Sequence, residues 1–381
     1  MADIDLLADK GIHDAVVRVE DADGAPLLVE AGGEAQPGVA MTAAHGFHIA
    51  SVTKTMTAAV VLQLGEEGAL GSRGIDAAYG DFGVFAPEIT ARLHRSGGES
   101  LAHRITLRHL LTHTSGLRDA MEDDAATLGG PAPDSLIGRI LAPGGDPRHA
   151  WKPWDPEWPL DPEAGVINLF LANGTADAPL AAPGEGFHYS DTGFMLLALL
   201  IEKLTGSTLG DAYRERLFAP LGLADTYLAY RNDPPGLGPH REPEAEVWMG
   251  PMPVLGSGAS LSFDWGGGGV VSSAASLNRF LRGLLGGALF RDSRTLAAML
   301  DWRTPPGLAA PRTGVGLGIF RTEDAGLELI GHSGASGAKM FHAPRHGFFI
   351  AGTINQMAGP GTWHWPIAHH VAAASSAGGQ A

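Results

Sequence analysis

Residues 47–54 read Phe-His-Ile-Ala-Ser-Val-Thr-Lys, and the helical run that begins at Ser51 continues until Gly68 stops it. Residues three apart on a helix share a face, so the Ser51 hydroxyl and the Lys54 amine are expected within hydrogen-bonding distance. A serine becomes a nucleophile when a neighbouring base takes its proton. Lysine serves as that base only if burial or a nearby cation lowers its pKa. This segment therefore predicts Ser51 as a nucleophile and Lys54 as its base.

Two later segments carry groups that could complete such a site. Tyr189 precedes an apolar helix and could relay a proton, although Ser190 or Asp191 could equally be a simple helix cap. The sequence His332-Ser-Gly334 follows a strand-like run. A glycine in an edge strand lets a substrate approach the backbone, whose N–H groups can stabilise an oxyanion. The alternative for this segment is a glycine-rich turn with an incidental histidine.

In this order, the three segments resemble the motifs of the penicillin-recognising serine hydrolases, and residues 105–117, 218–223 and 268–273 also fit. That group includes class C β-lactamases, D,D-peptidases, D-aminopeptidases, D-amino-acid amidases and esterases. The resemblance implies an α/β, β-lactamase/transpeptidase-like fold: an antiparallel sheet flanked by helices, with a mostly helical second domain. It also implies an acyl-enzyme on Ser51, proton transfer by Lys54 and Tyr189, and an oxyanion hole made by the backbone N–H groups of Ser51 and Ala335.

Two positions depart from the commonest family pattern. The tyrosine motif ends in Asp191 where asparagine is usual, and the third motif begins with His332 where lysine is frequent. A histidine with an ordinary pKa is mostly neutral at pH 7, and an aspartate would repel a substrate carboxylate. Asp191 would also tend to hold Lys54 protonated unless it points away. We therefore expect a substrate without a carboxylate near the scissile bond, either an ester or an amide with a free amine.

The candidate substrate-binding residues come from three parts of the chain. The tryptophans among them could line a pocket or could pack a long loop onto the helices. The candidates are Asp191, His332, Ser333, Gly334, Trp151 and Trp154.

The predicted function is cleavage of a carboxylic ester or amide by a serine hydrolase. A β-lactamase or a D,D-carboxypeptidase is the alternative within the same chemistry. An acyltransferase and a penicillin-binding sensor that does not turn over are further alternatives.

The composition of the chain limits the classes of binding partner and cofactor that we expect. The 381 residues carry a net charge of −16 and no cysteine, which disfavours nucleic-acid binding and excludes thiolate chemistry. His109 and His113 stand four apart without a third ligand, so we expect no metal, and no phosphate loop or cofactor motif is present. The expected partner is a small ester or amide. No basic-then-apolar leader and no long apolar run occurs, so we expect no membrane span and a cytoplasmic location.

Strand patterns lie near both chain ends and helical patterns lie between them. We therefore predict a sheet domain from residues 1–70 and 256–381, an inserted helical domain from residues 71–255, and an active site in the cleft between them. Residues 191–204 and 274–285 are predicted helices, residues 315–320 a strand, and residues 129–186 a long irregular connection.

Overall fold

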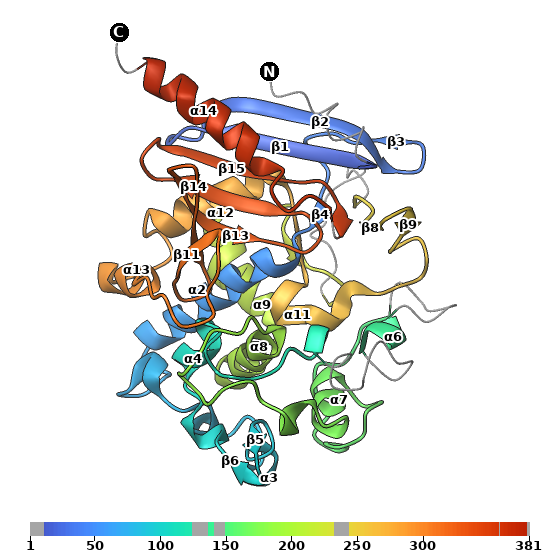
Figure 1. The fold of residues 1–381 in the computed structure, drawn as a ribbon, viewed down its shortest axis with the longest axis vertical. Coiled ribbons are helices and arrows are strands. Elements are labelled where there is room, and N and C mark those ends of the chain that lie inside the picture. The colour runs from blue at the N-terminus through green and yellow to red at the C-terminus, as the bar shows by residue number, and fades with distance from the viewer. Residues whose placement is uncertain (1–10, 124–135, 141–148, 232–243, 358, 379–381) are drawn as a thin grey trace.

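The fold is built around one large antiparallel sheet whose strands come from both ends of the chain (Figure 1). The computed structural model describes residues 11–123, 136–140, 149–231, 244–357 and 359–378. The eight strands lie in the order β11-β12-β13-β14-β15-β1-β2-β3. Their bounds are β1 Asp14–Glu20, β2 Pro26–Gln36, β3 Val39–Ala40, β11 Arg312–Val315, β12 Phe320–Asp324, β13 Leu327–Ser333, β14 Lys339–Ala343 and β15 Phe348–Thr353. Strand β1 pairs with β15, and this pairing joins the N-terminal strands to the C-terminal strands in one sheet.

Helices cover both faces of this sheet because its strands are apolar on both sides. Val17 and Val19 of β1 face the C-terminal helix α14 (His364–Gly378), and Figure 1 shows this helix lying along the sheet. Val16 points to the opposite face, where it joins the main core beneath α12 (Ala274–Leu285). The alternation of neighbouring residues between two cores is the period-two signature of a strand.

Helix α2 (Thr53–Glu66) runs through the main core and is buried on nearly every side. Its threonine hydroxyls must therefore find partners, since a buried polar group without a hydrogen bond is costly. Thr55 donates to the backbone oxygen of Gly318 at 2.9 Å, and Thr57 donates to that of Gly266 at 2.5 Å. These bonds tie the helix to two glycine-rich segments far away in the sequence.

The remaining elements are short. The other described helices are α3 Pro87–Thr90, α4 Leu107–Leu111, α6 Leu136–Ile140, α7 Val166–Ala172, α8 Asp191–Thr205, α9 Leu209–Tyr213, α10 Ala219–Leu221, α11 Trp265–Gly268 and α13 Ser293–Met299. Small ladders are formed by β4 Phe47–His48 with β10 Val270–Ser272 and β7 Tyr227–Leu228, by β5 Arg95–Ser96 with β6 Glu99–Ser100, and by β16 Gln356–Met357 with β8 Trp248–Met249 and β9 Met252–Pro253.

Helices α3 and α7 lie at the end of the molecule opposite the large sheet (Figure 1). Every described strand between residues 71 and 255 lies outside that sheet. This arrangement agrees with an inserted helical segment, although the domain boundaries at residues 70 and 255 stay a prediction.

The predicted helices at 191–204 and 274–285 are confirmed, and Gly206 ends the first of them in a left-handed conformation. The predicted strand at 315–320 is wrong. The chain turns between β11 and β12, with Gly318 at a φ of +70°. The residues of this turn are apolar because they are buried against α2, and a run of apolar residues is also typical of a strand. The expected irregular connection also contains the buried helix α7.

Within the described residues, no single helix has the length and apolar character needed to cross a bilayer. The bent pair Asp191–Thr205 and Leu209–Leu221 passes that test by length and composition alone.

The close approach of Gly318 to α2 predicts a steric cost for any side chain at that position. A Cβ there would lie 2.5 Å from the Cβ of Ala58. Gly318→Ala should lower the free energy of unfolding by about 1–3 kcal/mol beyond the cost of the left-handed backbone. Gly71→Ala is the matched control, because its φ is +66° and a Cβ there would meet nothing within 4 Å. Urea denaturation of both variants measures the difference, and equal losses would show that this packing is looser than the structure indicates.

Candidate active site

Ser51 lies at a strained turn that leads into α2. The residues Ala50–Val52 form a short 3-10 turn, and Ala50 has a φ of +45°, which a residue with a Cβ rarely adopts. Such strain persists only where the surrounding structure enforces it, often at functional sites. The turn places Ser51 on the wall of a cavity of about 380 Å³, a size suited to a small molecule.

Lys54 is completely buried, and its amine has three acceptors. Its Nζ lies 3.0 Å from Ser51 Oγ, which confirms the predicted contact, and 2.8 Å from the backbone oxygen of Gly267. The third acceptor is Oδ1 of Asp191, with which Lys54 forms an ion pair. A lysine ammonium has three N–H donors and no acceptor, so this environment matches the charged form.

The charge state of Lys54 differs from the one that its role as a base requires. Burial acts to lower the Lys54 pKa, but the carboxylate of Asp191, helped by Tyr189 and Asp264, outweighs burial and raises this pKa above its ordinary value. Asp191 therefore points toward Lys54 and holds it protonated, which is one of the two outcomes that the sequence left open.

Tyr189 is held beside Lys54 by a histidine. The Tyr189 ring stacks on that of His113 at 4.2 Å, and His113 Nδ1 accepts a hydrogen bond from the Ser190 backbone N–H at 3.1 Å. Burial, together with the charge of Lys54, holds the pKa of His113 well below its ordinary value, so this ring is neutral. Burial also raises the pKa of Tyr189, against the opposing effect of Lys54. Tyr189 is therefore a neutral hydroxyl that can donate a proton.

The end of β13 meets the turn that carries Ser51. A Cβ at Gly334 would lie 2.3 Å from the Ile49 backbone oxygen, so only glycine allows this approach. The Ser336 hydroxyl donates to the backbone oxygen of His48 at 2.8 Å and fixes the following turn. Residues 333–336 consequently line the same cavity as Ser51. The oxyanion hole formed by the N–H groups of Ser51 and Ala335 stays a prediction, and both residues are on the cavity wall.

The other predicted binding residues divide into two groups. Asp191, Ser333 and Gly334 line the cavity, whereas His332, Trp151 and Trp154 are not among its lining residues. His332 belongs to β13 and its side chain is buried, and burial together with the charge of Lys54 holds its pKa well below the ordinary value.

The two tryptophans pack against other aromatic rings instead. Trp154 makes an edge contact with Phe85 at 4.8 Å, and Trp151 makes one with His149 at 5.1 Å. This is the packing alternative that the sequence left open.

Two buried acids near Lys54 were missed by the sequence analysis. Asp119 accepts hydrogen bonds from the backbone N–H groups of Asp191, Met121 and Glu122, and burial raises its pKa to about 7. Asp264 precedes α11 and lines the cavity. The available signal was the run of four glycines after Asp264. A Cβ at Gly267 or Gly268 would fall within 2.1 Å of its carboxyl oxygens, so the run leaves room for this carboxyl.

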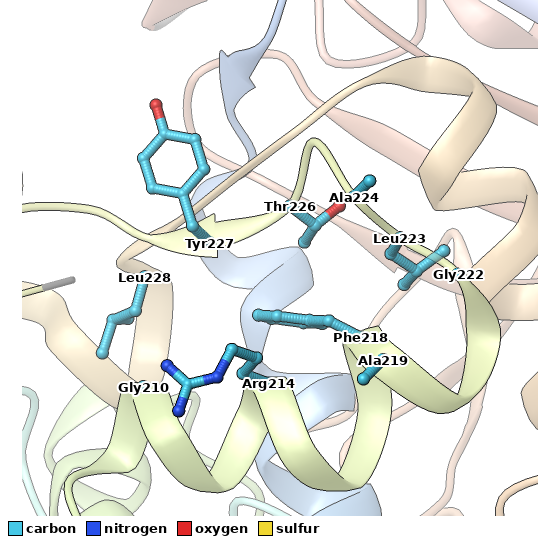
Figure 2. A pocket seen from close by; sticks show the side chains of 10 residues that line it. All are labelled: Gly210, Arg214, Phe218, Ala219, Gly222, Leu223, Ala224, Thr226, Tyr227 and Leu228. Atoms are coloured by element: carbon cyan, nitrogen blue, oxygen red, sulfur yellow. The ribbon is translucent and has the colours of Figure 1, made fainter. Parts of the chain in front are cut away.

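A second hollow, of about 310 Å³, lies between the helical stretch that carries Arg214 and Phe218 and the segment leading into β7 (Figure 2). Its polar groups already have partners. Arg214 pairs with Asp211 at 2.7 Å, Thr226 bonds to Ser272 at 2.8 Å, and the Tyr227 hydroxyl donates to Glu244. The described residues that line this hollow therefore offer apolar surface but no free reactive group, and the Ser51 cavity is the candidate active site.

Comparison with known proteins agrees with this geometry. A D-stereospecific amidohydrolase from Streptomyces sp. superposes with a TM-score of 0.69 at 26% identity, over 93% of this chain and 92% of that one. Penicillin-binding protein 4* of Bacillus subtilis (strain 168) is 28% identical over 185 residues, which are 49% of this chain and 31% of that protein. Esterase EstB of Burkholderia gladioli is 33% identical over 181 residues, which are 47% of this chain and 37% of the esterase. The matches thus span about a third of the length of these two curated relatives.

The antiparallel sheet, its covering helices and the superposition define a β-lactamase/transpeptidase-like fold. The family model described as Beta-lactamase matches residues 6–372, nearly the whole chain. The chain belongs to this Beta-lactamase family.

The ion pair predicts a pH-dependent stability defect in Asp191→Asn. In the wild type, the Lys54 pKa lies above its unfolded value, so the stability gained from this group is constant between pH 6 and 9 and is lost only as the pH rises further. Without Asp191, the burial of Lys54 remains, and the pKa of Lys54 in the folded state should fall below its pKa in the unfolded state. The unfolded state then binds more protons, and the defect should shrink as pH rises, by at most about 1.4 kcal/mol per pH unit.

Urea denaturation at pH 6 and pH 9 measures this change. The control is Asp301→Asn, which alters an exposed pair with Arg303. A defect of equal size at both pH values would contradict the assigned charge state of Lys54.

Proposed function

We propose that this chain is a serine hydrolase that cleaves a carboxylic ester or amide through an acyl intermediate on Ser51. The observation that carries the proposal is the contact of Ser51 Oγ with a fully buried lysine that is itself paired with a carboxylate. A nucleophile, a proton acceptor and an orienting third group are the parts that activated serine requires. The relatives named as an esterase and as an amidohydrolase support the same chemistry.

The proton inventory suggests a relay through Lys54. Lys54 first passes a proton to Asp191, and its neutral amine then takes the Ser51 proton as Oγ attacks the carbonyl carbon. Tyr189 then donates its proton to the leaving oxygen or nitrogen, and the proton on Asp191 returns through Lys54 to Tyr189. The leaving group thus gains the proton that Ser51 lost. Water attacks the acyl-serine in the second half-reaction, and the same groups act in reverse.

The backbone N–H groups of Ser51 and Ala335 are the proposed oxyanion donors. Two such donors, fixed by the close packing of Gly334 on Ile49, would stabilise the negative charge of each tetrahedral intermediate.

The contacts of Asp191 and His332 bear on the charge of the substrate. Asp191 is committed to Lys54, so its charge is balanced and does not by itself exclude a carboxylate-bearing substrate. His332 is neutral and buried, so it does not supply the positive charge that a lysine would place there. An uncharged or amine-bearing ester or amide remains the proposed substrate.

Ser51→Ala should reduce kcat/KM by at least about a thousandfold while the thermal unfolding temperature stays near that of the wild type. The substrates would be p-nitrophenyl acetate and butyrate, a D-amino-acid amide and nitrocefin. Intact-protein mass spectrometry would follow the adduct on Ser51 during turnover.

Each outcome of this panel assigns a function. Fast ester or amide turnover with a transient adduct supports the proposal. Rapid nitrocefin hydrolysis would show that the protein is a β-lactamase instead, and a persistent β-lactam adduct would indicate a sensor. Faster product formation on adding an alcohol or amine would reveal acyl transfer. Undiminished turnover by Ser51→Ala would remove Ser51 from the mechanism.

A further inference from the structure

More carboxyl groups are buried around Lys54 than its single positive charge can neutralise. Asp191, Asp119 and Asp264 are all buried and all interact electrostatically within this cluster. Lys54 is fully committed, because its three donors go to Ser51, Gly267 and Asp191. Among the described residues, this leaves two buried carboxyls without a cation of their own.

Asp119 and Asp264 differ in how their oxygens are satisfied. Both oxygens of Asp119 accept backbone N–H bonds, which accounts for its burial. Asp264 is 7% exposed, its Oδ1 is buried, and this oxygen has no hydrogen-bond partner among the described residues. A buried polar atom that stays unpaired is costly and calls for an explanation.

Asp264 is also placed to meet a substrate. It lines the same cavity as Ser51, Tyr189 and Asp191. A Cβ at Gly267 would lie 2.1 Å from Asp264 Oδ1 and 3.4 Å from Lys54 Nζ, so the carboxyl lies near the reacting groups. Glu122, which is exposed, lines the cavity as well and adds to its acidic character.

We infer that Asp264 binds a cationic amine on the substrate, so that the preferred substrates are aminoacyl esters, amides or short peptides with a free amino group. This inference rests on the proposed function and assigns the amine-binding role to Asp264 instead of Asp191. The donors suit an organic ammonium better than a metal ion, because no group of three metal-ligating side chains is assembled within the described part of the chain.

The direction of the Asp264 pKa shift is consistent with a missing cation. Burial raises its pKa well above the ordinary value and Asp191 raises it further, while Lys54 acts in the opposite direction. A substrate ammonium would supply the positive charge that the cluster lacks and would favour the ionised carboxylate.

Arg312 also lines the cavity, and its positive charge would favour an anion instead. Its guanidinium carbon lies 4.5 Å from the Phe320 ring centre and 5.4 Å from that of Tyr189. Aromatic faces stabilise a cation at such distances, so Arg312 does not require a substrate carboxylate. A preference for carboxylate-bearing substrates is therefore an outcome that the experiment must be able to show.

The test compares three substrates with the same scissile bond: phenylalanine methyl ester, its N-acetyl derivative and its N-succinyl derivative, each in both stereochemical forms. Wild type should favour the free amine over the N-acetyl ester by at least about tenfold in kcat/KM. Asp264→Asn should remove most of that ratio. Asp23→Asn, which removes the same charge from an exposed turn, should keep it.

Two results would overturn the inference: an unchanged ratio in Asp264→Asn, or a wild-type preference for the N-succinyl ester. If Asp264→Asn does not fold, inhibition of wild-type ester turnover by benzylamine and by benzyl alcohol replaces it. The amine should inhibit at least about tenfold more tightly, and equal inhibition would again overturn the inference.

Failure of the proposed function would be seen separately. The neutral substrate p-nitrophenyl acetate tests Ser51 acylation without involving the amine. If this ester acylates Ser51 while the amine ratio is unaffected by Asp264→Asn, only the role of Asp264 is wrong.

Discussion

A lysine ammonium completely withdrawn from water is the constraint on which the active-site region depends. Removing an isolated ammonium from water costs several kcal/mol, so the fold must surround Lys54 with acceptors. It does so with Ser51 from the turn before α2, the Gly267 carbonyl from α11 and the Asp191 carboxylate from the start of α8. Because these segments are far apart along the chain, the acceptors assemble only if α2, α8 and α11 pack closely.

Small residues make that packing possible. A Cβ at Gly266 would lie 2.3 Å from Ala198 on α8, and one at Gly318 would lie 2.5 Å from Ala58 on α2. Interiors packed this tightly do not yield to an added methyl group without a shift of neighbouring atoms. The glycine run after Asp264 therefore serves two purposes: it brings the Gly267 carbonyl to Lys54 and leaves room for the Asp264 carboxyl.

The aspartate at position 191 alters the electrostatics of the whole site. It converts Lys54 into one half of an ion pair, and it contributes to the raised pKa values of Asp119 and Asp264. Proton transfer from Ser51 must then involve the lysine and the carboxylate together. The same surplus of acid makes the cavity more receptive to a cation, which links the proposed reaction to the proposed amine-bearing substrate.

The sequence by itself determined the helix that carries Lys54, the contact of Lys54 with Ser51 in the preceding turn, the helices at residues 191 and 274, and the order of the motifs. These features follow from local periodicity and end signals. It did not determine the turn at Gly318 or the helix at Val166, because short apolar runs such as these are compatible with a strand, a helix or a buried turn. Only the tertiary structure decided the charge state of Lys54, the burial of His332 and the place of Asp264. Each of these depends on groups brought together from distant segments, and electrostatic and desolvation energies arise from that proximity in space.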